Sequence, residues 1–175
     1  MISSKEDIGE ELRQLSEVAS QAIDEVREVS FDLHPHTLDR LGLKKGIESI
    51  INKFSQTSPV RFSSVLDEID KCFTTKEEIN IFRIVQECLN NVIKHSKATE
   101  CFVQIQCIDK ICQIVVKDNG IGFDMQKYIL NPTEYQGMGL AGIQERVMLL
   151  NGKLVIKSEK GTVVNITIPF SGEKK

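Results

Sequence analysis

Residues 111–123 read ICQIVVKDNGIGF and join an apolar stretch to a glycine-rich loop. Apolar residues in a short run that ends at a turn predict a strand over 111–117. The loop opens with Asp118, and Gly120 and Gly122 follow. Glycines let a backbone approach a flat ligand closely, and a carboxylate can accept a hydrogen bond from an exocyclic amine. Because D-N-G also forms ordinary turns, this stretch predicts a binding loop only together with other parts of the chain.

Strands and helices are mixed on both sides of this stretch without strict alternation. The predicted strands cover 60–66, 100–108, 111–117, 153–158 and 162–170. The predicted helices cover 43–56, 75–96 and 139–150. Thr74 or Thr75 is the expected N-cap of the long helix, with acidic residues in its first turn. The order of elements predicts an α+β fold, a two-layer sandwich in which helices cover one face of a mixed sheet.

The first 36 residues carry a different pattern. Apolar residues recur at spacings of four and three, at Ile8, Leu12, Leu15, Ala19, Ala22, Val26, Val29 and Leu33. This heptad pattern predicts one long coiled-coil-type helix that pairs with another helix and ends at Pro35. The alternative is an amphipathic helix that lies on the chain's own domain. The expected organisation is a helix over 1–36, a connector over 37–42 and a domain over 43–175.

Composition excludes several classes of protein. Hydrophobic residues make up 41% of the 175 residues and charged residues 27%, which argues against global disorder. The net charge of -3 shows no basic excess of the kind that nucleic-acid binding needs. No apolar run reaches the length of a membrane span, and the polar N-terminus does not resemble a signal peptide. Five cysteines without a C-x-x-C pair predict small core residues of a cytosolic protein.

The long helix gathers polar residues on one face. At 100° per residue, Glu87, Asn91 and Lys94 share that face, whereas apolar residues that include Val92 and Ile93 lie opposite. An acid can activate a water or a nucleophile, an amide oxygen can ligate Mg²⁺, and a lysine can neutralise phosphate oxygens. The alternative is an ordinary solvated face.

A second glycine-rich stretch, GMGLAGIQER, covers residues 137–146 and opens the last predicted helix. Free N–H groups and the positive end of the dipole make a helix N-terminus a seat for phosphate. A lone G-x-G-x-x-G is weak evidence, and a long irregular loop precedes this one instead of a strand. Its weight comes from its place after the other two stretches.

Taken together, these motifs resemble a known family. QECLNNVIKH at 86–95 looks like the N box, DNGIGF at 118–123 the first glycine box, GMGLAGIQER the second, and GTVVNITIP at 161–169 the closing strand. Residues 40–170 thus resemble the ATP-binding catalytic domain of histidine kinases, in the Bergerat (GHKL) superfamily of gyrase, heat-shock protein 90 and mismatch-repair ATPases. Residues 24–43 resemble the second dimerisation helix and its exit in nitrate-sensor-like and fluidity-sensor-like kinases.

The resemblance implies roles for the residues that match its motifs. Glu87 would be the catalytic acid or base beside the γ-phosphate and, through a water, beside Mg²⁺, which Asn91 would ligate. Lys94 and His95 would contact phosphates, with Lys94 also catalytic. The remaining implied ATP contacts are Asp118 on the adenine amino group, Gly120 and Gly122 at the adenine wall, Gly137, Met138, Gly139, Leu140 and Gly142 around the phosphates, and Thr162 beside the adenine. Residues 124–136 would form the ATP lid.

The implied function is that of a sensor histidine kinase fragment. It would bind Mg-ATP and transfer the γ-phosphoryl group to a histidine absent from this chain, for relay to an aspartate of a response regulator. None of His34, His36 and His95 is followed by the expected acidic residue, so the chain alone is expected not to phosphorylate itself. The missing phosphoacceptor helix, the response regulator and a homodimeric parent are the expected partners, with neither nucleic acid nor membrane contact. The expected location is cytoplasmic, with any membrane anchor outside this segment.

Two alternatives stay open at this point. One is an anti-sigma-type serine kinase of the same superfamily, which would act on a small partner protein. The other is a non-catalytic module for nucleotide-dependent dimerisation or partner binding. A pure binder needs neither Glu87 nor Lys94, so these two residues favour the kinase.

Overall fold

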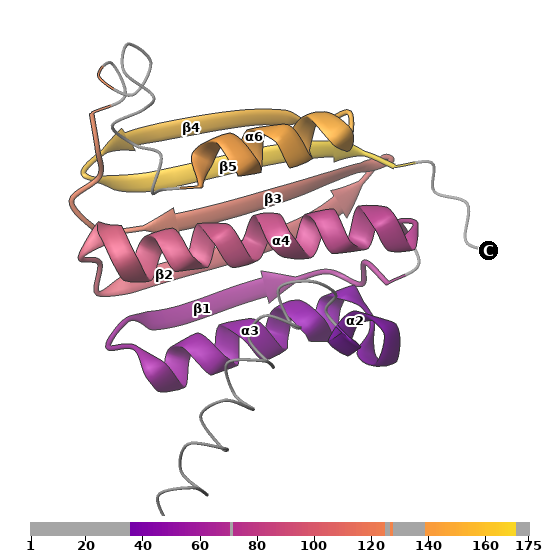
Figure 1. Cartoon of the computed structure of the whole chain (residues 1–175), viewed down its shortest axis with the longest axis horizontal. Coiled ribbons are helices and arrows are strands. Elements are labelled where there is room, and N and C mark those ends of the chain that lie inside the picture. The colour runs from indigo at the N-terminus through magenta and orange to yellow at the C-terminus, as the bar shows by residue number, and fades with distance from the viewer. Residues whose placement is uncertain (1–35, 71, 125–126, 128–138, 171–175) are drawn as a thin grey trace, which may run out of the picture. The chain divides into compact units, whose positions relative to one another are not determined.

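The computed structural model describes residues 36–70, 72–124, 127 and 139–170 (Figure 1). The predicted N-terminal helix, most of the predicted lid, and Gly137 and Met138 lie outside the described residues. Among the helices that are described, none combines the length and the apolarity that a bilayer crossing requires.

Five strands form one mixed sheet. They are β1 (Arg61–Leu66), β2 (Glu100–Ile108), β3 (Ile111–Asp118), β4 (Lys153–Glu159) and β5 (Gly161–Pro169). Their order across the sheet is β1-β2-β3-β5-β4, with β1 parallel to β2 and every other pair antiparallel. The α+β prediction with a mixed sheet is therefore confirmed.

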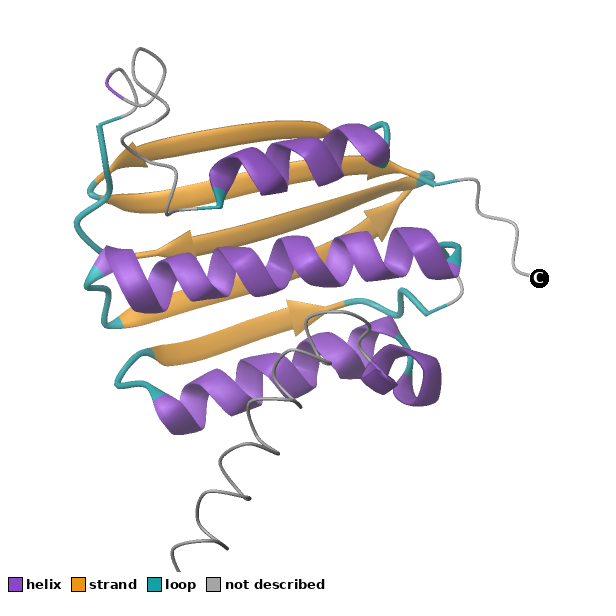
Figure 2. Cartoon of the chain, in the orientation of Figure 1, coloured by secondary structure: helices purple, strands orange, loops and turns teal. Residues whose placement is uncertain are grey.

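Helices cover one face of this sheet. The main helices are α3 (Leu43–Thr57), α4 (Thr75–Asn91) and α6 (Leu140–Leu149). Figures 1 and 2 show the three side by side in front of the strands, and they contact β1, β3 and β4 respectively. Alternate strand residues point toward them and are buried, including Val103, Ile105, Ile114, Val164, Ile166 and Ile168. Side chains alternate between the two faces of a strand, so one face of each strand supplies the core.

Helix α4 starts and ends in different ways. Thr74 caps its N-terminus in a capping box with Glu77, which satisfies otherwise unpaired N–H groups. At its C-terminus the chain continues as a π-helical turn, η1 (Val92–Ser96), which ends at Lys97 in the left-handed conformation. Of the two predicted N-cap positions, Thr74 and Thr75, the structure has Thr74.

Two local expectations differ from the structure. The segment expected as a connector contains a short helix, α2 (His36–Leu41). Ile93, predicted on the buried face, is 36% exposed. Residues of a π-helical turn do not follow the 100° spacing of an α-helix, so the face assigned at 100° per residue still holds for the buried Val92 but fails at Ile93.

The β2–β3 hairpin closes through a tight two-residue turn. Asp109 and Lys110 have φ values of 52° and 64°, which are typical of a type I′ turn. The prediction that all five cysteines are core residues is only partly right. Cys88, Cys101 and Cys112 are buried, but Cys72 and Cys107 are only partly buried. Cys107 is the last but one residue of β2, where the helix layer no longer covers the strand fully.

Candidate functional site

A cavity lies between the C-terminal part of the N-box helix and strands β3 and β5. Its lining combines residues of α4, η1, β3, the loop after β3, the start of α6 and β5: Cys88, Asn91, Val92, His95, Ser96, Val116, Gly122, Phe123, Leu140, Thr162 and Val164. Five of the residues predicted from sequence to bind nucleotide are among them: Asn91, His95, Gly122, Leu140 and Thr162. The fold thus brings together residues of the N box, both glycine boxes and the closing strand.

Asp118 lies at the end of β3 and is 6% exposed. It does not line this cavity itself, but it contacts Thr162, which does. Asp118 instead lines a second hollow, together with residues that include Arg61, Glu100 and Asn119. Its Oδ1 accepts a hydrogen bond of 2.7 Å from the N–H of Gly120. The backbone and the hydroxyl of Thr162 also form hydrogen bonds with the carboxylate. Burial raises the pKa of Asp118, and these hydrogen bonds oppose the rise. The two residues predicted to hold one ligand group, Asp118 and Thr162, are therefore in direct contact.

Two glycines permit this packing of backbone on backbone. A Cβ at Gly120 would lie 2.2 Å from the carbonyl oxygen of Ser96. A Cβ at Gly161, whose φ is +90°, would lie 2.2 Å from the carbonyl oxygen of Asp118. Both distances are far below van der Waals contact, so each position requires glycine.

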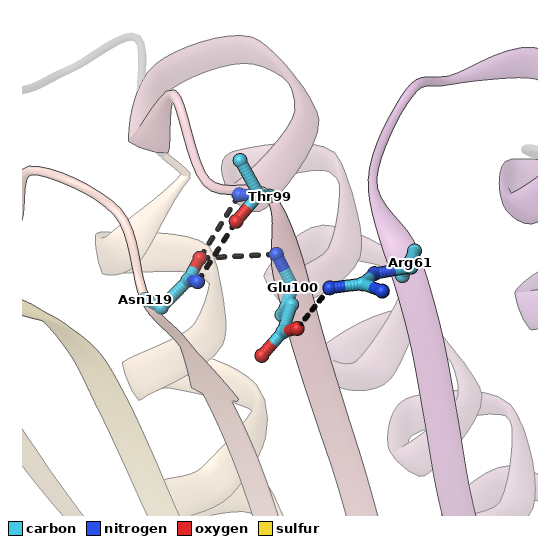
Figure 3. Close-up of polar contacts among 4 residues, drawn as sticks. All are labelled: Arg61, Thr99, Glu100 and Asn119. Atoms are coloured by element: carbon cyan, nitrogen blue, oxygen red, sulfur yellow. Dashed lines mark hydrogen bonds and ion pairs between the residues drawn. The ribbon is translucent and has the colours of Figure 1, made fainter.

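Asn119 holds the first glycine box to the start of β2 (Figure 3). Its Oδ1 accepts hydrogen bonds from the N–H groups of Thr99 and Glu100, at 2.9 Å and 3.0 Å. Its Nδ2 donates to the hydroxyl of Thr99 at 2.9 Å. Glu100 also forms an ion pair with Arg61 on β1. The Asn119 side chain thus holds the loop that begins at Asp118 against the backbone of Thr99 and Glu100.

Two serines hold the rest of the loop. The carbonyl of Ser96 accepts a 2.8 Å hydrogen bond from the N–H of Ile121. The hydroxyl of Ser158 accepts a 2.7 Å hydrogen bond from the N–H of Phe123. Through Ser96 the end of the N-box helix sets the position of the loop, so the two motifs are mechanically connected.

The remaining predicted residues surround the cavity less closely. Glu87 packs against Gly139, since a Cβ on that glycine would lie 1.8 Å from Oε1 of the acid. Gly139 is the N-cap of α6, in the left-handed conformation. Lys94 is exposed on η1 and does not line the cavity. Gly142 lies in the first turn of α6, where Arg146 donates to its carbonyl at 2.9 Å.

The motifs contain residues whose part in the site was missed from sequence. Asn119, Ser96 and Ser158 received no role, although each holds the loop that carries Asp118. Asn119 lies inside the quoted motif, and an asparagine beside a turn is a frequent partner of backbone groups. For the two serines the sequence gives no comparable signal, because their partners are 25 and 35 positions away.

The cavity has a mostly apolar lining that includes a buried polar atom. His95 Nε2 is buried there without a hydrogen-bond partner among the described residues, and buried polar atoms are normally paired. For a cation, Asn91 and Glu87 supply the hard oxygen donors that Mg²⁺ prefers. Over residues 36–70, 72–124, 127 and 139–170, no group of three or more His, Cys, Asp or Glu side chains could by itself hold a metal. A magnesium ion held by Asn91 and Glu87 alone would have open positions that phosphate oxygens or waters could fill.

Comparison with known protein families assigns the chain. Residues 76–172 match the family described as histidine kinase-, DNA gyrase B-, and HSP90-like ATPase. The chain belongs to this family, and the match extends from the first turn of α4 to just beyond β5.

Sequence relatives narrow the class to sensor histidine kinases. The chain is 31% identical over 157 residues to the sensor histidine kinase ComP of Bacillus subtilis, covering 90% of this chain and 20% of ComP. It is 33% identical over 166 residues to the signal transduction histidine-protein kinase/phosphatase DegS of Brevibacillus brevis, covering 94% of this chain and 42% of DegS. The chain thus spans less than half the length of these relatives, and what it shares with them is the ATP-binding catalytic domain of a sensor histidine kinase.

Solved structures share the fold. The histidine kinase domain of a blue-light activated kinase from Erythrobacter litoralis superposes with a TM-score of 0.64 at 20% identity, covering 75% of this chain and 63% of that domain. A mycobacterial sensor histidine kinase, MprB, gives 0.57 at 19% identity, covering 74% and 95%.

Proposed function

We propose that this chain binds Mg-ATP in the cavity beside Asp118 and donates the γ-phosphoryl group to a histidine of a dimerisation helix outside this sequence. The transfer would break the terminal P–O bond of ATP and form a P–N bond to the imidazole, releasing ADP. The phosphoryl group would then pass to an aspartate of a response regulator. Family membership supports ATP as the ligand, and the arrangement of the described residues supports the roles below.

The adenine end of the nucleotide would meet Asp118 and Thr162. The carboxylate would accept a hydrogen bond from the exocyclic amine, and the threonine hydroxyl would add a second polar contact. The observation that carries the proposal is the contact of Asp118 with Thr162, because Thr162 lines a mostly apolar cavity, and a flat ring with one polar edge fits such a site. Gly120 and Gly122 would form the wall against which the ring lies.

The phosphate end would lie toward α6 and the N box. Asn91 would ligate Mg²⁺, and Glu87 would reach it through a water; the ion would neutralise charge on the phosphate oxygens. His95 Nε2 would find there the partner that the described residues do not supply. Lys94 is exposed, so its side chain would need to turn inward to reach the phosphates. The lid at 124–136 and the glycines at 137–142 would enclose the phosphates.

Glu87 is the residue we assign to the chemistry. Its carboxylate lies against Gly139 at the start of α6, where a phosphate would be attracted by the helix dipole. There it would orient the attacking imidazole and take its proton as the P–N bond forms.

The partners follow from this reaction. The acceptor helix would come from residues resembling the first dimerisation helix, and residues 1–36 would pair with it in a homodimer, joined through 37–42 to the domain at 43–175. None of His34, His36 and His95 would be the acceptor. The domain would act in the cytoplasm, where ATP and response regulators are found.

Calorimetric titration with a non-hydrolysable ATP analogue tests the binding step. With Mg²⁺ present we expect binding, and removing Mg²⁺ should weaken it at least tenfold. Asp118→Ala should abolish it, whereas Asp67→Ala, at the far end of the sheet, should not change it. A folded chain that binds no analogue would overturn the nucleotide proposal and favour a partner-binding module.

The transfer step needs a second experiment. The chain is incubated with radiolabelled ATP and an acceptor-helix fragment of the DegS relative, which supplies the histidine. Label should appear on the fragment and not on this chain, and Glu87→Ala should remove the label while analogue binding persists. Label on a serine of a partner would support the anti-sigma-type alternative, and label on this chain would contradict the acceptor assignment.

A further inference from the structure

Two cysteines face one another at the end of the sheet that lies away from Asp118. Cys107 on β2 is the register partner of Cys112 on β3. Six residues of extended strand separate Cys112 from Asp118, so the two ends are about 20 Å apart. The thiol pair therefore lies outside the nucleotide site, and neither residue lines its cavity.

The backbone brings these two residues within disulfide range. The N–H of Cys107 donates to Oδ2 of Asp67 at 3.0 Å, not to β3. The pair Cys107–Cys112 is therefore a non-hydrogen-bonded pair of the antiparallel ladder, in which Cα atoms are about 4.5 Å apart. Disulfides span Cα separations of roughly 4.4–6.8 Å. The tight turn at Asp109 and Lys110 fixes this register, so no backbone movement is needed to join the two sulfurs.

The two thiols differ in a way that suits stepwise oxidation. They are hydrogen-bonded to one another, and this bond lowers the pKa of Cys107 against the opposing effect of burial. The same bond and burial raise the pKa of Cys112, which is 0% exposed. Cys107 is only partly buried. One partner is thus accessible and more acidic, and the other is a buried thiol beside it.

The other cysteines provide internal comparisons. Burial raises the pKa of Cys88, and it raises the pKa of Cys101 to about 12. Both are buried and protonated at neutral pH, so neither should react with a mild oxidant. The charge of Cys72 contributes to the raised pKa of Cys112, which places this third sulfur near the pair.

We propose that Cys107 and Cys112 form a redox-active dithiol that a peroxide converts into a cross-strand disulfide. The Cys107 thiolate attacks one peroxide oxygen; an S–O bond forms, the O–O bond breaks, and the released hydroxide takes a proton to become water. Cys112 sulfur then attacks the sulfenic sulfur; the S–S bond forms, the S–O bond breaks, and a second water carries away the thiol proton. Two thiols are oxidised, and one peroxide is reduced to two waters.

Peptide mapping of the peroxide-treated chain tests this proposal directly. Trypsin cuts after Lys97, Lys110 and Lys117, so Cys107 and Cys112 fall on separate peptides, 98–110 and 111–117. After brief treatment with hydrogen peroxide and alkylation of remaining thiols, we expect these peptides to be cross-linked, with a mass about 2 Da below their sum. Fragmentation should place the link at Cys107 and not at Cys101, and Cys88 should remain a thiol.

Serine variants separate the two steps. Cys112→Ser should leave Cys107 as a sulfenic acid that dimedone traps, and Cys107→Ser should prevent oxidation of Cys112. Cys72→Ser is the matched control and should form the 107–112 disulfide as the natural chain does. Uncross-linked peptides after peroxide treatment of the natural chain, or a link from Cys72 to Cys112 instead, would overturn the proposal.

Discussion

At both ends of the sheet a side-chain oxygen accepts backbone N–H groups of β2 or the residue before it, but only one end has the features of a binding site. Near Asp118, the side chain of Asn119 accepts the N–H groups of Thr99 and Glu100. At the hairpin end, Asp67 accepts the N–H of Cys107. Near Asn119, His95 Nε2 has no hydrogen-bond partner in the part of the chain that the structure describes, and Gly120 and Gly161 let backbone segments pack directly on one another. A side chain that accepts backbone N–H groups is thus found at both ends of the sheet. What distinguishes the end near Asp118 is a cavity lined by a buried atom that has no partner among the described residues.

Helix α4 connects these two ends and shows the same contrast. At its start, close to the hairpin end, Thr74 and Glu77 satisfy each other's backbone groups. There the neighbouring rings of Phe73 and Phe170 pack with centroids 5.5 Å apart. At its finish the helix widens into η1 and presents His95 to the cavity. A stable start and a widened end are consistent with the frequent use of π-helical turns at functional sites.

The largest effect is expected from a single methyl group at the nucleotide end. Gly161→Ala would place a Cβ against the Asp118 carbonyl at a positive φ, so it should lower the free energy of unfolding by about 3 kcal/mol. Gly142→Ala is the control, because its Cβ would meet only the flexible end of Arg146. Urea unfolding measures both. An unchanged free energy of unfolding in Gly161→Ala would show that the loop beginning at Asp118 can move away from β5.

Substitutions of Asn119 and of Asp67 should have similar effects on stability but different effects on nucleotide binding. Asn119→Leu removes the acceptor of two exposed backbone N–H groups, and Asp67→Leu removes the acceptor of one partly buried N–H group. Each variant should therefore lower the free energy of unfolding by a similar amount, about 1 kcal/mol. Only Asn119→Leu should also weaken binding of the ATP analogue, by tenfold or more, because Asp118 is the next residue. Asn119→Asp keeps the acceptor oxygen and should restore most of the affinity. Equal losses of affinity in both leucine variants would break the comparison between the two ends.

A smaller effect is expected at the start of α4. Thr74→Ala removes the hydroxyl that accepts from Glu77 N–H and should lower the free energy of unfolding by about 1 kcal/mol. Thr74→Ser retains a hydroxyl and serves as the control. Analogue affinity should be unchanged in both, since the cap lies about five helical turns from the start of η1. A loss of affinity with the alanine variant would mean that unwinding at the N-terminus of α4 disturbs the cavity at its C-terminal end.

The smallest effect concerns pH. Burial raises the pKa of Asp118 above its unfolded value of about 3.9, so the native state holds the proton more tightly than the unfolded state. This contribution to stability is present at low pH and is lost as pH rises through the folded pKa. The stability of the natural chain relative to Asp118→Asn should therefore fall as the pH rises above the unfolded pKa of about 3.9, as measured by urea unfolding at several pH values. A relative stability that rises with pH would show that the hydrogen bonds from Gly120 and Thr162 outweigh burial.

Strand positions were predictable because they depend on local pattern. The stretches 100–108 and 111–117 alternate or run apolar and are bounded by a turn, and the structure has β2 and β3 within one residue of them. The N-cap at Thr74 followed from its side chain and the acids after it. The face of 92–96 was not predictable in this way, because Ile93 lies where the helix period itself changes. The pairing of Asp118 with Thr162 was reached through resemblance, not through spacing.

The sequence by itself determined the five strands, the three main helices, their order and the motifs that place the chain among the histidine kinase-like ATPases, because local preference and short motifs depend on neighbouring residues. Only the tertiary structure decided that Asn119 holds Thr99, that Ser96 positions the loop of Asp118, and that Cys107 faces Cys112. The contacts of Asn119 and Cys107 depend on the register of the β2–β3 hairpin, and that of Ser96 depends on how the end of the helix packs on the loop after β3. The register follows from the two-residue turn and from which side chains the helix layer buries, and a shift of one residue would reverse every face.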